Sequence, residues 1–283
     1  MSPTATLLAL TSILLWSFLA LLGARLNHLP PFLVVAIALT VSGLLSSFNF
    51  RSWRVPCITL AIGIGGIFGY HFLYFSSFKY APAVEANLMN YLWPLLIVIL
   101  SPLYLYGYEL RPHHLIGAAV GLIGAGLIIT GGRLSLDIAN MKGYLLAAGA
   151  ALTWASYSLL TKRLPSFPTG AVGAFCLSSG LLAFGAFWLT SSAIEPVHLT
   201  RSDWIALFLL GAGPMGAAFF TWDAALKRGD PRIIGSLAYL TPMTSTLVLI
   251  LLGGYTMTWI SALAMVLIVS GAVIGSWDLF TKR

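Results

Sequence analysis

The sequence of 283 residues predicts an all-α integral membrane protein with ten transmembrane helices in two inverted five-helix repeats. Hydrophobic residues make up 59% of the chain and charged residues only 8%, whereas about a quarter of the residues in a soluble domain are charged. Apolar runs long enough to cross about 30 Å of hydrocarbon recur from end to end. They are continuous rather than alternating, which favours helices over a β-barrel. The third observation is an internal repeat.

Ten apolar runs separated by polar residues are the expected helices. The first follows "MSPT", which contains no Lys or Arg, and no clear cleavage site comes after it, so we expect this run to stay in the protein as a helix. In chain order the runs cover residues 4–22, 32–48, 56–78, 84–106, 112–131, 142–161, 170–190, 203–225, 231–252 and 257–277.

The second half of the sequence repeats the first. "LLALTSILLWSFLALLGARL" aligns with "LLAAGAALTWASYSLLTKRL", which places Trp16 on Trp154 and Arg25 on Arg163. Residues 1–135 and 142–283 are therefore expected to form one five-helix repeat each. Since five crossings are an odd number, the second repeat enters the membrane from the opposite side. Inverted repeats are a signature of secondary transporters, whose site lies where the halves meet. Further matched pairs are Ser42 with Ser179, Lys79 with Lys227, Tyr91 with Tyr239, and Pro94 with Pro242.

The positive charges favour an orientation with both termini in the cytoplasm, because cytoplasmic loops carry the excess of Lys and Arg. That orientation places Arg51, Arg54, Arg111, Lys162, Arg163, Lys227, Arg228, Arg232, Lys282 and Arg283 inside, and Arg25, Lys79, Arg133, Lys142 and Arg201 outside. The basic residues are scattered between apolar runs, so the net charge of +7 indicates topology and not a nucleic-acid partner.

The fourth expected helix carries a polar stripe. Asn87, Asn90, Tyr91 and Pro94 fall at i, i+3, i+4 and i+7, on one helical face. Carboxamides facing lipid are costly, so this face is expected to line a cavity, although asparagines that only bind neighbouring helices would satisfy the same pattern. Trp93 lies at the edge of the stripe, where a lipid-facing position is the alternative.

Aromatic residues and one histidine extend this candidate site. Tyr70 and His71 lie in the third expected helix, and an intramembrane histidine is a functional candidate unless a neighbouring hydroxyl or carbonyl merely satisfies it. Trp16 and Trp154 are expected at matching depths, where helix packing is the alternative role. Together with Tyr91, Trp93 and Tyr239 they predict an aromatic chamber for a planar or cationic ligand.

Few ionisable side chains lie within or near the expected helices. Glu85 and Asp223, with Lys79, are candidates for a gate or for coupling, although Asp223 is also placed for an ordinary ion pair with Lys227. Asp278 is expected to be solvated. The adjacent His113 and His114 are expected to point in divergent directions, and neither they nor Cys57 and Cys176 predict a metal site. Enzyme motifs are absent from the sequence, so no catalytic residue and no cofactor is expected.

"YELRPHHLIGAAVGLIGAGLII" resembles the end of the EamA repeat of the drug/metabolite transporter superfamily, and "LKRGDPRIIGSLAYLTPMTSTLVLILLGG" follows the same repeat in the second half. "FKYAPAVEANLMNYLWPLLIVIL" resembles the version of the repeat seen in aromatic amino acid exporters. The resemblance covers nearly the whole chain. It implies a secondary transporter in a bacterial inner membrane that exports aromatic and other hydrophobic amino acids and related small metabolites. Because the two fused halves already form a complete unit, a monomer is expected to suffice.

The mechanism expected from this resemblance is alternating access, with Pro94 and Pro242 as helix hinges, because a proline inside a helix removes a hydrogen bond and makes a bend easy. Asn90 and Trp93 become Ala238 and Thr241 in the second half, so recognition is expected on the first copy. Exporters of polyamines, sugars or cationic drugs stay open as alternatives, as does a gated channel.

Overall fold

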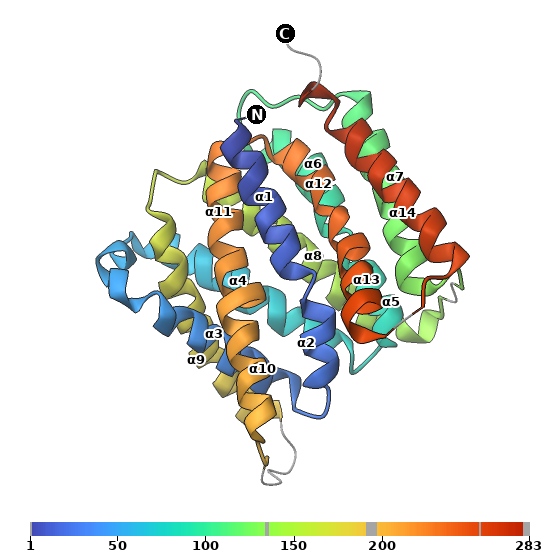
Figure 1. Ribbon diagram of the computed structural model, residues 1–283. Coiled ribbons are helices and arrows are strands. Elements are labelled where there is room, and N and C mark those ends of the chain that lie inside the picture. The colour runs from blue at the N-terminus through green and yellow to red at the C-terminus, as the bar shows by residue number, and fades with distance from the viewer. Residues whose placement is uncertain (1, 134–135, 191–196, 255, 280–283) are drawn as a thin grey trace.

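The computed structural model describes residues 2–133, 136–190, 197–254 and 256–279. Within these ranges the chain is helical and contains no strand. Figure 1 shows a bundle in which α1 begins and η5 ends at the same end. Lys282 and Arg283, two of the charges assigned above to the cytoplasmic side, lie outside the described residues.

Helix lies in each of the ten expected ranges. The first half contains α1 (Pro3–Trp16), α2 (Leu19–Arg25), α3 (Pro31–Leu45), η1 (Ser47–Trp53), α4 (Cys57–Ser77), α5 (Ala83–Asn90), α6 (Trp93–Tyr104) and α7 (Pro112–Thr130). The second half contains η2 (Ile138–Asn140), α8 (Met141–Arg163), η3 (Thr169–Ala171), α9 (Val172–Thr190), α10 (Arg201–Ala212), η4 (Gly213–Ala217), α11 (Ala218–Arg228), α12 (Pro231–Ala238), α13 (Leu240–Gly253), α14 (Trp259–Gly275) and η5 (Trp277–Leu279).

Local chemistry explains where these helices begin. Pro3, Pro31, Pro112 and Pro231 occupy first-turn positions, where a backbone N–H would have no helical partner. The Asp230 side chain accepts a hydrogen bond from the N–H of Arg232 and caps α12.

Seven stretches among the described residues are long and apolar enough to cross a membrane. They are Pro3–Arg25, Cys57–Ser77, Ala83–Tyr104, Pro112–Thr130, Thr169–Thr190, Arg201–Arg228 and Pro231–Gly253. An eighth is formed if α3 and η1, which are bent by 85°, count as one span. The chain is therefore a helical, multi-pass membrane protein.

Four of the spans are broken. α5 and α6 are separated at Tyr91 and Leu92, and α12 and α13 are separated at Tyr239. Each break comes shortly before one of the predicted hinge prolines, which then lies in the first turn of the following helix. Two further breaks were not predicted: α1 ends at Trp16 without a proline, and α10 passes into a π-helical turn, η4, that contains Pro214.

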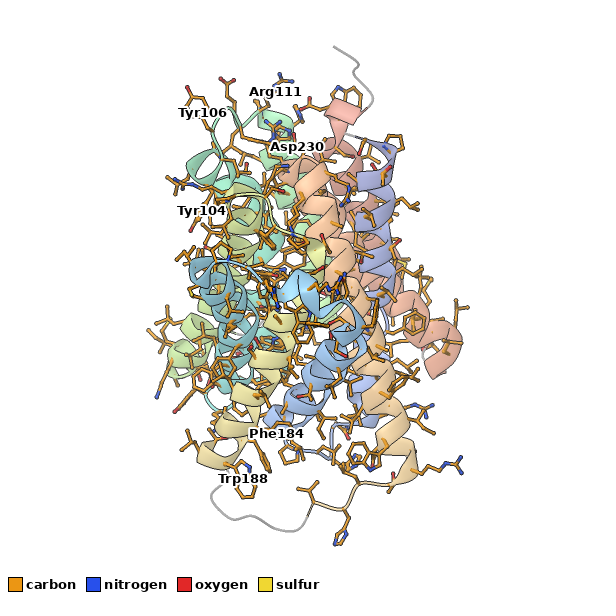
Figure 2. All side chains as sticks on the ribbon, turned by 90° about the vertical axis from the view of Figure 1, so that its left-hand side faces the viewer. Tyr104, Tyr106, Arg111, Phe184, Trp188 and Asp230 are labelled. Atoms are coloured by element: carbon orange, nitrogen blue, oxygen red, sulfur yellow. The ribbon has the colours of Figure 1, made fainter. Side chains whose placement is uncertain are left out.

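The helices of one half pack against those of the other. α7 lies along α14, α3 along α9, α4 along α8, and α1 along α11. Small residues bring α7 and α14 together: a Cβ atom on Gly271 would lie 2.5 Å from the backbone nitrogen of Gly121. Figure 2 shows the two ends of the bundle, with Tyr106, Arg111 and Asp230 at one end and Trp188 near the other.

Candidate functional site

Four tryptophans from four helices meet in the interior of the bundle. The ring centroid of Trp16 lies 5.9 Å from that of Trp93, 6.0 Å from Trp154 and 5.0 Å from Trp222, and Trp93 lies 5.6 Å from Trp222. The four side chains, here called the tryptophan cluster, come from α1, α6, α8 and α11, two from each half of the chain. All four are buried. The cluster therefore lies where the halves meet, as the sequence predicted for Trp16, Trp93 and Trp154.

Hydrogen bonds hold two of these indoles in place. Nε1 of Trp16 donates to the backbone carbonyl of Pro214 at 3.1 Å, in the π-helical turn η4. Nε1 of Trp222 donates to Oγ of Ser158 at 3.0 Å. Both indole N–H groups thus have partners inside the bundle, and their ring faces and edges are left to contact other aromatic groups.

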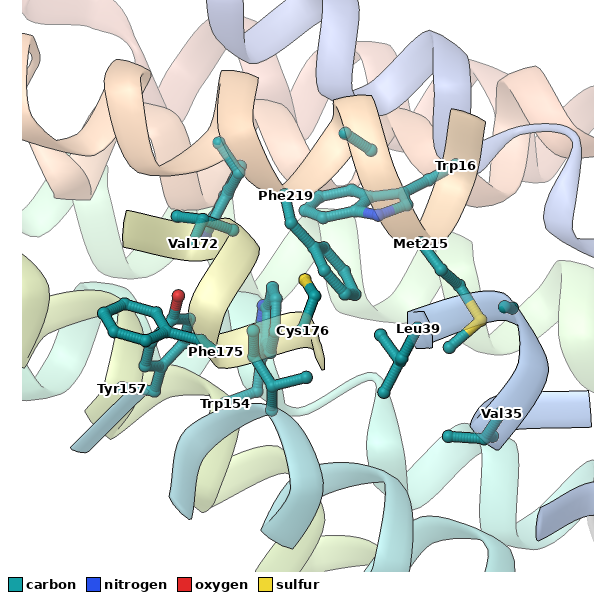
Figure 3. Close-up of a cluster of buried hydrophobic side chains, with 14 of the residues drawn as sticks. Trp16, Val35, Leu39, Trp154, Tyr157, Val172, Phe175, Cys176, Met215 and Phe219 are labelled. Atoms are coloured by element: carbon teal, nitrogen blue, oxygen red, sulfur yellow. The ribbon is translucent and has the colours of Figure 1, made fainter. Parts of the chain in front are cut away.

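Tyr70, His71 and Phe219 extend the cluster. The ring centroid of Tyr70 lies 5.3 Å from Trp154, and that of His71 lies 6.2 Å from Phe219, whose ring in turn lies 5.3 Å from Trp154. Figure 3 shows Trp16, Trp154 and Phe219 among the surrounding apolar side chains. Nδ1 of His71 lies 2.7 Å from the carbonyl of Ile67. Since a carbonyl only accepts, Nδ1 carries a proton, and when the ring is neutral its Nε2 atom is an acceptor.

Asn90 places a carboxamide beside these rings. Its Nδ2 atom donates to the Tyr70 hydroxyl at 3.2 Å. The side chain is 4% exposed, and its Oδ1 atom has no hydrogen-bond partner among the described residues. Buried polar atoms are normally paired, so this oxygen is suited to a ligand donor. Asn87 lies one turn earlier and accepts a hydrogen bond from the Tyr74 hydroxyl at 3.0 Å.

The structure does not bring every predicted site residue to the cluster. Tyr239 is fully buried in a separate group of side chains with Val98, Ala118, Ala125 and Ile268. Its ring packs against Gly121. Tyr91 is half-buried beside this second group. The structure therefore places Tyr239 apart from the tryptophan cluster, whereas Tyr91 also lies near Tyr70 and Tyr74.

Phe219 and Trp222 were missed as site residues. They are three positions apart on α11, so they share a helical face. In the alignment of the two halves, Phe219 and Trp222 correspond to His71 and Tyr74. This correspondence is the sequence signal from which they could have been predicted.

The three ionisable candidates lie outside the cluster. Glu85 accepts a hydrogen bond from the Tyr144 hydroxyl, which joins α5 to α8. Lys79 lines a small cavity of about 260 Å³ with Phe32, Phe75 and Phe187. Asp223 forms the expected ion pair with Lys227 at 2.6 Å.

A further contact of Asp223 crosses to the segment before α9. Its Oδ2 atom also accepts a hydrogen bond from the Thr169 hydroxyl at 2.7 Å. The carboxylate is 2% exposed, and this buried ion pair therefore ties α11 to η3.

The expectation of divergent histidines and a solvated Asp278 is wrong. Nε2 of His113 and Nε2 of His114 lie 3.2 Å and 3.3 Å from the Asp278 carboxylate, and Nη1 of Arg111 lies 3.1 Å from it. The reason is that η5 folds back after α14 and brings Asp278 over the start of α7.

Two imidazoles and a carboxylate are a donor set for a transition metal. However, Nδ1 of His114 accepts the backbone N–H of Arg111 at 3.2 Å, which leaves the proton of the neutral ring on Nε2. Arg111 competes for the same carboxylate. The group is therefore better described as an ion-pair cluster than as a metal site.

A helical bundle that crosses a membrane several times and encloses a buried aromatic site between its halves has the organisation of a small-molecule transporter. The chain belongs to the EamA-like transporter family, whose model matches residues 3–130 and again residues 141–277.

Relatives with curated names support this assignment. The chain is 41% identical to the aromatic amino acid exporter YddG of Ancylobacter novellus, over 96% of this chain and 97% of that one. It is 26% identical to the aromatic amino acid exporter YddG of Escherichia coli K12, over 86% of each chain. It is 25% identical to a probable amino-acid metabolite efflux pump of Salmonella typhimurium LT2, over 100% of this chain and 98% of that one. These relatives are named as exporters or efflux pumps and not as enzymes, so the chain is a transporter.

One solved crystal structure has the same fold. It is 40% identical to this chain, covers 98% of both chains and superimposes with a TM-score of 0.90.

Proposed function

We propose that this protein exports aromatic and other hydrophobic amino acids, and related small metabolites, across the bacterial inner membrane by alternating access. The observation that carries the proposal is the tryptophan cluster with the unpaired oxygen of Asn90 beside it. The names of the relatives support the substrate class.

The chemistry of this site suits an aromatic amino acid. Indole rings accept an aromatic side chain edge to face, with a gain of about 0.5–1.5 kcal/mol for each pair beyond the burial of area. The ammonium group of the substrate is a donor for Oδ1 of Asn90, and the same cation is attracted to the face of a tryptophan. Nε2 of His71, whose ring centroid lies 6.2 Å from that of Phe219, is a further acceptor when the imidazole is neutral.

The proposed topology has ten crossings, an inverted repeat over residues 1–135 and 142–283, and both termini in the cytoplasm. Two findings support it: the family model matches each half separately, and the packing is reciprocal. Exchanging the halves converts the contact of α4 with α8 into that of α1 with α11, whereas α3 with α9 and α7 with α14 each correspond to themselves. An approximate twofold axis in the membrane plane has this effect.

The proposed hinges are Pro94 and Pro242, since helix breaks precede both. The contacts of Glu85 with Tyr144, and of Asp223 with Thr169 and Lys227, are proposed as gates at opposite ends of the bundle. Lys79 lies at the same end as Glu85. A transporter of this kind is complete within one chain, so a monomer is expected to function.

Counterflow in proteoliposomes tests the proposed function. Vesicles loaded with unlabelled phenylalanine are expected to accumulate labelled phenylalanine, tryptophan or leucine transiently, while putrescine, glucose and arginine do not compete. Transient accumulation against a gradient excludes a channel. A repeat with an imposed pH gradient shows whether protons are coupled. Competition by putrescine but not by phenylalanine contradicts the proposal and favours export of cationic compounds.

A matched pair of variants tests the site itself. Asn90→Ala removes a hydrogen bond to a charged group, worth about 1.5–3 kcal/mol, so binding of the substrate is expected to weaken about tenfold to hundredfold. Asn140→Ala, which changes the same type of residue outside the bundle interior, is the control and is expected to bind as the wild type does. Equal affinity of the two variants would remove Asn90 from the site.

A further inference from the structure

A groove of about 710 Å³ lies between α2 and α10. Its walls are mainly apolar, and the residues that form them include Leu15, Phe18, Leu22, Ile205, Leu209 and Pro214. Arg25, Ser202 and Asp203 line it as well. Figure 1 shows α2 and α10 near the same end of the bundle, opposite to the end at which α1 begins.

The inner end of the groove reaches the tryptophan cluster. Pro214 lines the groove, and its backbone carbonyl accepts the hydrogen bond from Trp16. Leu15, which precedes Trp16 in α1, lines the groove too. A single layer, made by Trp16 and the η4 turn, thus separates the groove from the aromatic site. Helix α1 ends at this layer, and π-helical turns such as η4 are frequent at functional sites.

Among the described residues, Arg25 and Asp203 give the groove a cation and an anion. Arg25 is exposed and forms no hydrogen bond or ion pair with any residue in the described ranges. Asp203 is buried and immobilised, because its Oδ2 atom accepts hydrogen bonds from the Thr200 N–H at 2.8 Å and the Thr200 hydroxyl at 2.7 Å. Its Oδ1 atom lies 3.4 Å from Nε2 of His28. An apolar wall between a cation and an anion matches the chemistry of a zwitterion with an apolar side chain.

We propose that this groove is a second binding site for the amino acid, on its way out of the chamber: Arg25 binds the carboxylate, Asp203 attracts the ammonium group, and the apolar wall receives the side chain. This inference rests on the proposed function. The wall formed by α2 contains no buried residue, so it can move aside to release the ligand without opening the protein core.

Equilibrium binding of labelled tryptophan to the purified wild-type protein tests the second site. The expected result is two binding sites for each chain. The groove is expected to be the weaker site and the tryptophan cluster the stronger one. In Arg25→Gln, the affinity of the groove falls about twofold to fivefold, as is usual for an exposed charge pair, and the affinity of the tryptophan cluster is unchanged. The matched control is Arg133→Gln, which removes an exposed cation after α7, away from the groove. One binding site in the wild type, or equal binding by the two variants, overturns the inference.

Filling the groove gives a second test. Leu209→Trp places a large side chain in the wall and is expected to abolish the weaker site and slow export. Leu152→Trp, at a similarly exposed leucine of α8 outside the groove (48% exposed against 50% for Leu209), is the control. Loss of a co-purified phospholipid in Leu209→Trp, with tryptophan binding unchanged, overturns the inference in favour of a lipid site.

The two proposals fail in different ways. If the wild-type protein neither binds nor transports tryptophan, the proposed function is wrong. If the wild type transports tryptophan and the Arg25 and Leu209 variants behave like their controls, only the second site is wrong.

Discussion

At the scale of single residues, the candidate site depends on a few side chains whose partners are defined. Trp16, Trp93, Trp154, Tyr70, His71 and Asn90 were predicted from the sequence, and the structure brings all of them into or beside one cluster. Their residue types were informative because polar groups such as an amide or an imidazole are costly when they face lipid, and are therefore expected to face the bundle interior.

Two residues lie elsewhere than the sequence pattern indicated. Tyr239 lies at the α12–α13 break and packs with Val98 and Ile268, apart from the tryptophans with which it was grouped. The prediction for Asp278 missed its ion pairs, because the position of η5 depends on tertiary contacts with α7 that no local sequence pattern specifies.

The Asp278 cluster gives a prediction of pH dependence. Burial alone would raise the pKa of Asp278, but the neighbouring His113, Arg111, His114 and Arg232 outweigh it and hold this pKa below its ordinary value, because all four are positively charged at the acidic pH at which a carboxyl group titrates. A carboxylate with a lowered pKa in the folded state stabilises that state above its unfolded pKa of about 3.9, and this contribution is lost as the pH falls through the folded value.

Asp278→Asn is therefore expected to lower the stability at pH 7 by up to about 1 kcal/mol, the usual range for partly exposed ion pairs. Thermal unfolding in detergent, followed by tryptophan fluorescence, measures this effect. Glu109→Gln at the same end of the bundle is the control. The difference between wild type and variant is expected to begin to shrink as the pH falls below about 3.9 and to vanish only below the lower pKa of the folded state. A difference that does not shrink at all as the pH is lowered from 7 to 2 would show that charge is not its cause.

At the scale of helices, the breaks are the features that matter for movement. The α5–α6 and α12–α13 breaks were anticipated from "NYLWP" and "AYLTP", because a proline prevents the normal hydrogen bond to the residue four positions earlier. Pro94 and Pro242 lie in the first turns of α6 and α13, where this hydrogen bond is not required. The two broken helices also touch: a Cβ atom on Gly235 of α12 would lie 3.0 Å from the carbonyl oxygen of Pro94.

The remaining breaks show the limit of sequence patterns. The α1–α2 break follows no proline or glycine. Oγ of Ser17 instead lies 2.8 Å from the carbonyl oxygen of Ile13 and 2.6 Å from the hydroxyl of Thr244 in α13, in hydrogen-bonding contact with both. A break stabilised by a distant helix cannot be recognised locally. Pro214 within the eighth expected helix was a visible signal, but the π-helical form of the turn was not.

Replacing the hinge prolines tests whether the breaks move. In the double variant Pro94→Ala/Pro242→Ala, the α5–α6 and α12–α13 junctions can form continuous helices. Counterflow of tryptophan is therefore expected to slow strongly, while its equilibrium binding persists. The measurement is the initial rate in proteoliposomes set against equilibrium binding. Pro102→Ala, at a proline inside α6 beyond the break, is the control. Unchanged transport in the double variant would show that these prolines are not hinges.

At the scale of the whole molecule, composition alone was enough to predict a helical membrane bundle, since so few charges leave no alternative to burial in lipid. The internal repeat then predicted that the halves meet at the site, and the reciprocal pairing of helices agrees with that expectation. The groove between α2 and α10 was not foreseen, because a cavity depends on how side chains from distant segments pack.

The orientation can be tested with a natural probe. Of the two cysteines, Cys57 is exposed and Cys176 is buried. In the proposed topology Cys57 faces the cytoplasm, so a membrane-impermeant maleimide is expected to label it only after cells are permeabilised. Arg133→Cys in a Cys57→Ser background is the matched control and is expected to react in intact cells. The opposite pattern would reverse the orientation.

The glycine contact between α7 and α14 limits how such a molecule can change shape. The backbones touch at Gly121 and Gly271, where there is no room for a side chain, so turning either helix about its own axis would drive a bulkier neighbouring residue into the other backbone. We therefore expect this pair to be the stationary part of the transporter, and we expect the shape changes of the proposed transport cycle to occur in the broken helices α1–α2, α5–α6, α10–α11 and α12–α13 that surround the tryptophan cluster. A fluorophore pair placed across α7 and α14 should then report a constant distance throughout the cycle, which makes this seam the natural reference for measuring every other movement.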